Sequence, residues 1–109
     1  MKLNVAIVQF ACGESKSENI KRMLILLSKI RQTRVVCLPE AWIGRETVLE
    51  TRELEEILSL FGEIASKNSF YIFLGGLFIR REGKVCSTCY LVNDKGKVEG
   101  FSDKLFPSY

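Results

Sequence analysis

Two charged side chains stand where this 109-residue chain could carry out acid-base chemistry. Glu40 directly follows Pro39 at the end of a short apolar run, and Lys104 lies near the carboxyl end of the sequence. A carboxylate is suited to act as a general base, and an ammonium group stabilises a developing oxyanion. The carboxyl ends of strands in an α/β sheet are where such folds bind ligands. On position alone, however, each residue is more often a solvated surface charge.

Four thiols, Cys12, Cys37, Cys86 and Cys89, are the available nucleophiles, and the sequence has no histidine. Within this polypeptide, that composition excludes a Ser-His-Asp triad, a Cys-His pair and any zinc site that needs histidine. Cys37 belongs to an apolar run and is predicted to be a small core residue, whereas Cys12 follows a strand with no clearly placed cation beside it. Cys86 and Cys89 lie three apart in a strand pattern, which sends them to opposite faces, one buried and one partly exposed. We therefore expect no metal and no cofactor.

Composition describes a single domain over residues 1–109, because 47% of the residues are hydrophobic and the chain is too short for two domains. The formal net charge of +3 is too mild to indicate nucleic acid. Apolar runs are shorter than the roughly 20 residues of a membrane-spanning helix, so no membrane partner is expected. The first residues lack the pattern of a secretory signal, which predicts a cytoplasmic location and reduced thiols.

Hydrophobic periodicity in the first half of the sequence predicts a strand, a helix and a second strand, over residues 3–10, 15–32 and 34–38. Ser15 and Glu18 have the spacing of a capping box, in which each side chain satisfies a free backbone N–H at the start of a helix. Pro39 ends the second strand because it supplies no N–H to a sheet ladder.

The second half shows one further helix and three strands. We expect a loop over residues 41–50, with a helical turn near 47–49, and then a helix from Thr51 to Asn68. A strand follows over residues 70–79. Two further strands, over 84–92 and 97–101, are joined by the turn at 93–96. Gly75-Gly76 lies inside the first of these strands, which indicates a bulge and not a nucleotide-binding turn. The order βαβαβββ predicts an α/β domain with a mixed sheet.

Several of these segments resemble the nitrilase superfamily of carbon-nitrogen hydrolases. The runs that carry the resemblance are Val5-Ala6-Ile7-Val8-Gln9, Val35-Val36-Cys37-Leu38-Pro39-Glu40 followed by Trp42, Phe73-Leu74-Gly75-Gly76, Gly96-Lys97-Val98 and Asp103-Lys104-Leu105-Phe106-Pro107. Together they cover almost the entire chain. Two departures are Cys86-Ser87-Thr88, where the family usually has a Tyr-Asn-Ser-like segment, and the missing histidine after the lysine.

This resemblance implies half of a four-layer αββα sandwich, with a large apolar sheet face that something else must cover. In that family a cysteine attacks a nitrile or amide carbon, a glutamate is the general base and a lysine stabilises the tetrahedral intermediate. By motif match, Glu40 and Lys104 take the last two roles. The family's cysteine lies in its second half, and none of the four thiols of this sequence takes its place.

Three hypotheses follow from these observations. The first is the amino-terminal portion of a nitrilase- or amidase-type hydrolase of small amides or nitriles, which needs a complementary polypeptide to supply the nucleophilic cysteine. The alternative is a non-catalytic remnant that self-associates as a homo-oligomer by pairing its exposed sheet faces. A third is an unrelated small α/β binding domain in which Glu40 and Lys104 are surface residues.

Overall fold

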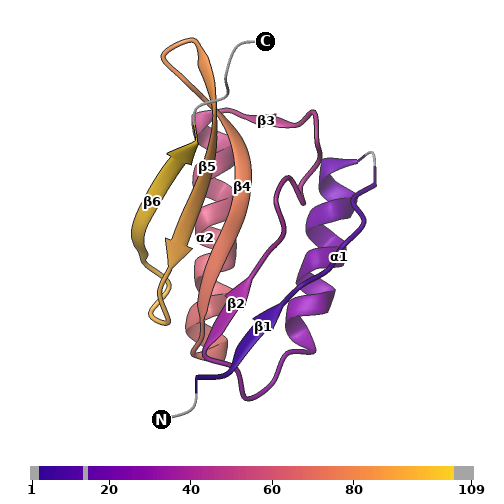
Figure 1. The fold of residues 1–109 in the computed structure, drawn as a ribbon, viewed down its shortest axis with the longest axis vertical. Coiled ribbons are helices and arrows are strands. Elements are labelled where there is room, and N and C mark those ends of the chain that lie inside the picture. The colour runs from indigo at the N-terminus through magenta and orange to yellow at the C-terminus, as the bar shows by residue number, and fades with distance from the viewer. Residues whose placement is uncertain (1–2, 14, 105–109) are drawn as a thin grey trace.

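The structure of the protein, a computed structural model, describes residues 3–13 and 15–104. Within these residues the chain forms a mixed six-stranded sheet and two helices (Figure 1). The elements are, in order, β1 (Val5–Ile7), α1 (Lys16–Ser28), β2 (Val35–Cys37), β3 (Val48–Leu49), α2 (Thr51–Asn68), β4 (Tyr71–Arg81), β5 (Lys84–Val92) and β6 (Val98–Lys104). No helix in the described part of the chain is long and apolar enough to cross a lipid bilayer.

The sheet has the strand order β1-β2-β4-β5-β6, and the short β3 pairs with the far end of β4. Strands β1, β2 and β4 run parallel, whereas β4, β5 and β6 form an antiparallel meander. The expected mixed sheet with a hairpin at one edge is therefore confirmed. Strand β4 lies at its centre, because it pairs with β2 and β3 along one side and with β5 along the other.

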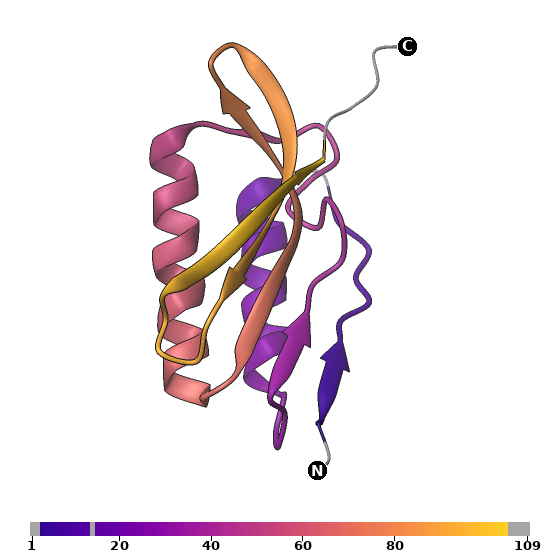
Figure 2. The ribbon, with the colours of Figure 1, turned by 60° about the vertical axis from the view of Figure 1, so that its left-hand side comes forward.

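Both helices pack against the same face of the sheet, as the side view in Figure 2 shows. Each helix has apolar residues at spacings of three and four, so that one side of the helix faces the sheet. The buried positions are Met23 and Leu27 in α1, Leu54, Ile57, Phe61 and Ala65 in α2, and Val36, Ile72, Leu74, Leu77, Ile79, Tyr90 and Val92 in the sheet. All of them belong to one continuous hydrophobic core.

The opposite face of the sheet, which we call the open face, has no helix against it within residues 3–13 and 15–104 (Figure 2). Successive side chains of a strand point to opposite faces, so residues paired with Ile7 across β1, β2 and β4 share its side of the sheet. These residues are Cys37 and Phe73. Ile7 and Phe73 are 76% and 38% exposed, whereas the adjacent Val36 and Ile72 are completely buried on the helix side. The two-layer structure thus leaves apolar side chains facing solvent.

Two local predictions were wrong. Residues 47–49 do not form a helical turn, since Val48 and Leu49 form strand β3 opposite Phe78 and Ile79. Leu49 is fully buried there, so pairing with a distant strand overrides its local preference. Helix α1 ends at Ser28, short of the predicted residue 32, and the chain turns through Gln32 with a positive φ of 51°.

The turn between β5 and β6 packs tightly against helix α2. A Cβ atom added at Gly62 would lie 2.6 Å from the carbonyl oxygen of Gly96, and one added at Gly96 would lie 2.7 Å from the carbonyl oxygen of Gly62. Carbon and oxygen atoms do not approach so closely without displacement, and both obstacles are backbone atoms that cannot rotate away. The two glycines therefore let the hairpin dock on the helix.

We predict that Gly62→Ala lowers the free energy of unfolding, although alanine favours a helix by about 1 kcal/mol over glycine. Crowding of a packed contact costs roughly 1–3 kcal/mol, which offsets or exceeds that gain. The matched control is Gly100→Ala in β6, where an added Cβ meets nothing within 4 Å. Urea unfolding followed by circular dichroism compares the two variants. A stabilised Gly62→Ala protein would contradict the close approach of helix and turn.

Candidate functional site

Glu40 lies at a bend where the chain leaves strand β2 and passes the bulge of β4. The predicted bulge is confirmed, because the pairing of β4 with β5 shifts register between Leu74 and Leu77. A Cβ at Gly75 would collide with the carbonyl oxygen of Pro39, at 2.5 Å, so only glycine permits this approach. The N–H of Ala41 then donates to the carbonyl of Gly76 at 2.8 Å. Backbone contacts on both sides thus hold Glu40 beside β4.

A small hollow of about 360 Å³ brings Glu40 and Lys104 together. Its lining residues are Leu38, Glu40, Gly75, Gly76, Ser87, Cys89, Ser102 and Lys104. Lys104 reaches this place because β6 pairs with β5 in a register that sets Lys104 opposite Ser87 and Ser102 opposite Cys89. Both charged residues are exposed to solvent. The structure therefore places the two predicted site residues in one hollow, whereas Leu105–Pro107 of the sequence motif lie outside the described residues.

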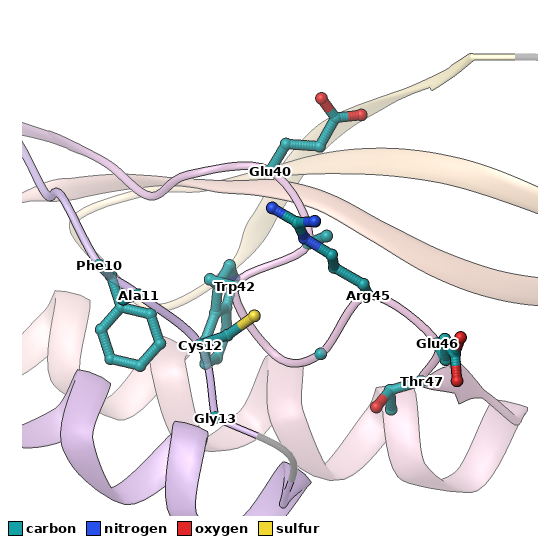
Figure 3. Close-up of a pocket in the computed structure, with 11 residues that line it drawn as sticks. Phe10, Ala11, Cys12, Gly13, Glu40, Trp42, Arg45, Glu46 and Thr47 are labelled. Carbon is teal, nitrogen blue, oxygen red and sulfur yellow. The ribbon is translucent and has the colours of Figure 1, made fainter.

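Glu40 also borders a second, larger hollow of about 870 Å³ on the other side of its loop. Two segments line it, residues 10–13 after β1 and residues 40–47 after β2 (Figure 3). In Figure 3 the side chain of Arg45 extends toward Glu40, whose carboxylate points away from it, and the thiol of Cys12 faces the same space. Glu40 thus stands on the boundary between the two hollows.

Arg45 is a site residue that sequence reasoning missed. Among the described residues it has no hydrogen bond or ion pair, while Arg80 and Arg81 each hold a carboxylate. Arg45 and Cys12 line the same hollow, so the folded chain brings a cation to this space although the sequence showed none clearly placed near Cys12. A guanidinium group in this position can bind a carboxylate or another oxyanion. The loop that carries it shows neither helical nor strand periodicity, so the sequence held no signal for its placement.

Asn19 of helix α1 joins the two segments that line the large hollow. Its side chain is completely buried. Its Oδ1 accepts a hydrogen bond from the N–H of Gly13 at 2.7 Å, and its Nδ2 donates to the carbonyls of Gly13 and Ile43, each at 3.0 Å. One amide therefore satisfies three backbone groups in two loops. Hydrophobic periodicity predicted that Asn19 lies in a helix. It did not indicate that the Asn19 side chain binds the two loops.

The four thiols differ in burial, with Cys86 buried and the other three half-buried. Cys86 is buried and Cys89 is half-buried, as expected for opposite faces of β5. Burial raises the pKa of the Cys89 thiol, and the nearby Cys37 adds to the rise. Cys37 is half-buried on the open face and is not the core residue that its apolar neighbours predicted. All four are free thiols, and the described residues contain no cluster of three or more potential metal ligands.

The mixed sheet with both helices on one face defines an α/β protein, in agreement with the fold that the sequence motifs suggested. The profile of the carbon-nitrogen hydrolase family matches residues 4–107. The chain belongs to the carbon-nitrogen hydrolase family.

Relatives of known description agree with this assignment. Nitrilase homolog 2 of Dictyostelium discoideum is 27% identical over 101 residues, which cover 84% of this chain and 30% of the relative. The nitrilase and fragile histidine triad fusion protein NitFhit of Drosophila melanogaster is 26% identical over 110 residues, covering 93% of this chain and 24% of the relative. The crystal structure of a carbon-nitrogen hydrolase from Helicobacter pylori superposes with a TM-score of 0.80 at 20% identity, covering 95% of this chain and 40% of that one. The chain thus spans well under half the length of the proteins it matches.

We predict that Asn19→Leu lowers the free energy of unfolding by about 2 kcal/mol or more, because it leaves buried backbone groups without hydrogen bonds. The matched control is Asn68→Leu, since Asn68 donates to the carbonyl of Ile64 at the exposed end of α2. Changes at such surface positions stay within about 0.5 kcal/mol. Denaturant unfolding measures both variants, and equal losses would show that Asn19 does not clamp the loops.

Proposed function

We propose that this chain is the amino-terminal portion of a nitrilase- or amidase-type hydrolase that acts on non-peptide carbon-nitrogen bonds of small molecules. In this proposal Glu40 is the general base, Lys104 stabilises the oxyanion, and a complementary polypeptide supplies the nucleophilic cysteine. The observation that carries the proposal is that Glu40 and Lys104 line one hollow. Membership of the carbon-nitrogen hydrolase family over residues 4–107 supports it.

The proposed chemistry follows from the properties of the three groups. A thiol is a weak nucleophile until it loses its proton, so the Glu40 carboxylate accepts that proton as the sulfur attacks the amide or nitrile carbon. The Lys104 ammonium group then lowers the energy of the negative charge that develops on the former carbonyl oxygen or nitrile nitrogen. From an amide, the proton held by Glu40 passes to the leaving nitrogen, and release of ammonia leaves a thioester. From a nitrile, the attack first gives a thioimidate, which adds one water before it releases ammonia and leaves the same thioester. A further water then hydrolyses the thioester to the carboxylic acid and the free thiol. Neither a metal nor a cofactor enters this sequence of steps.

Two observations support the part of the proposal in which additional polypeptide packs beside Glu40 and Lys104. This chain covers only 24–40% of the relatives and the solved structure described above. The small hollow opens on the sheet face that has no second layer, since Cys89 and Ser102 line it from that side. A polypeptide packed on the open face would bring its own side chains next to Glu40 and Lys104.

The alternative function, a non-catalytic remnant that self-associates, is favoured by a different observation. Val5, Ile7 and Phe73 expose large apolar side chains on the open face. Two copies that paired these faces would bury them against each other. This homo-oligomer would be non-catalytic and would therefore release no ammonia.

We predict that the chain, mixed with a polypeptide that carries the remainder of the family domain and its cysteine, releases ammonia from simple amides or nitriles. Glu40→Gln and Lys104→Met each reduce kcat by about 100-fold or more, because each removes a group that acts in the transition state. Glu46→Gln is the matched control, since Glu46 is an exposed carboxylate of the same loop that lines only the large hollow.

An enzyme-coupled ammonia assay separates the outcomes. Activity that falls with Glu40→Gln and stays within about twofold with Glu46→Gln supports the proposal, because general-base loss is far larger than twofold. Equal activity of all variants removes Glu40 from the mechanism. A complex that forms but releases no ammonia favours the non-catalytic alternative.

A further inference from the structure

Strand β6, which carries Lys104, is poorly anchored by hydrophobic packing. It is the outermost strand of the sheet and pairs only with β5 among the described strands. Its large apolar residues are exposed, and Phe101 in particular is 61% accessible to solvent. Edge strands of this kind rely on side-chain interactions to define their position. A polar network supplies these interactions at the end of β6.

The centre of that network is an ion pair that spans three strands. Arg81, the last residue of β4, reaches across β5 to Asp103 in β6. Its Nη1 donates to both carboxylate oxygens of Asp103, at 2.8 and 2.6 Å, and its Nη2 donates to the hydroxyl oxygen of Tyr90 at 2.7 Å. Thr88, which is completely buried in β5, donates its hydroxyl to Asp103 Oδ1 at 2.5 Å. Each strand of the meander therefore contributes a side chain.

Aromatic contacts fix the orientation of the guanidinium group. The Cζ atom of the Arg81 guanidinium lies 5.0 Å from the centre of the Phe101 ring, within the range of a cation-π interaction. Phe101 in turn packs on Tyr90 with ring centres 5.8 Å apart. The hydrogen bond from Thr88 lowers the pKa of the Asp103 carboxyl, burial opposes this, and Arg81 lowers it further. Asp103 is therefore ionised at neutral pH and keeps its partners.

Asp103 and Lys104 are consecutive, so they project to opposite faces of β6. Asp103 pairs with Thr88 on the helix side, and Lys104 pairs with Ser87 on the side of the small hollow. We propose that Arg81 and Asp103 are positioning residues, whose ion pair across β5 fixes the end of β6 and thereby holds Lys104 in the small hollow beside Glu40. This inference rests on the proposed function, because it assigns a purpose to the placement of Lys104.

An ordinary surface ion pair gives the contrasting case. Arg80, the neighbour of Arg81, binds Glu50 at the start of helix α2, with Arg80 Nε 3.0 Å from Glu50 Oε1. This pair is of the same type but does not touch β6. Arg80→Met is therefore a matched control for Arg81→Met, since each removes one arginine-carboxylate pair from adjacent positions of the same strand.

Carbodiimide coupling on the chain alone tests the inference. The reagent activates the Glu40 carboxyl, and attack by the Lys104 amine forms an amide bond while the carbodiimide leaves as its urea. Mass spectrometry of the digested protein measures this cross-link relative to the one between Lys16 and Glu53, which form an ion pair elsewhere in the structure. The reference pair lies on the two helices, so it does not depend on β6.

We predict that Arg81→Met and Asp103→Asn each lower the relative yield of the Glu40–Lys104 cross-link about threefold, the factor that a partly exposed ion pair contributes to an equilibrium. Arg80→Met leaves the ratio unchanged. The charge-exchanged double variant, Arg81→Asp with Asp103→Arg, recovers part of the loss. If the substitutions only destabilised the fold, Arg80→Met would also lower the relative cross-link yield. The charge-exchanged double variant would then recover none of the loss.

Two results overturn different claims. No Glu40–Lys104 cross-link in the unaltered chain would show that the two residues do not approach each other, which contradicts the proposed function itself. A cross-link that forms normally and is equally abundant in Arg81→Met and Asp103→Asn would overturn the positioning role while leaving the proposed function intact. Asp103→Asn retains acceptor and donor atoms at an edge strand, so it keeps the test decisive if Arg81→Met does not fold.

Discussion

The constraint on which this structure depends is a sheet covered by helices on one face only. Burial of apolar surface stabilises a protein by about 25 cal/mol per Å², and here the helices provide that burial for one side of the central strands β2, β4 and β5. The side chains of Val36 and Ile72 are completely buried on the helix side, whereas those of Ile7 and Phe73 on the other face remain exposed. The open face therefore retains exposed apolar side chains, and exposed apolar patches commonly mark interaction sites.

The candidate site lies on the open face, on the same side of the sheet as these exposed apolar side chains. Ser87 and Cys89 face the small hollow from β5, and Lys104 faces it from β6. Whatever covers the apolar part of the open face also comes close to Glu40. Stability and activity are thus linked in this account, because one packing event both buries Phe73 and completes the surroundings of the two charged residues.

The sequence predicted those features that depend on local patterns. Helix α2, the β5–β6 hairpin and the bulge at Gly75–Gly76 follow from periodicity and turn residues, and Pro39 correctly located Glu40 at a strand end. Strand β3 and the clamp formed by Asn19 escaped prediction because both depend on partners far away in the sequence. Arg45 was missed for the same reason, since the two loops of the large hollow meet only in the folded chain. The register that sets Lys104 opposite Ser87 also places Asp103 within reach of Arg81, a contact across three strands that no local pattern encodes.

Sedimentation equilibrium of the isolated chain tests most directly whether the open face is a surface that must be covered. We compare the unaltered chain with a variant carrying Ile7→Lys and Phe73→Lys, and with Ile25→Lys, which adds a charge at an exposed apolar position of helix α1. The account predicts that the unaltered chain and Ile25→Lys self-associate as concentration rises, whereas the open-face variant stays monomeric and keeps its circular dichroism spectrum. A stable monomer of the unaltered chain at every concentration would contradict it, because the exposed apolar side chains would then need no partner.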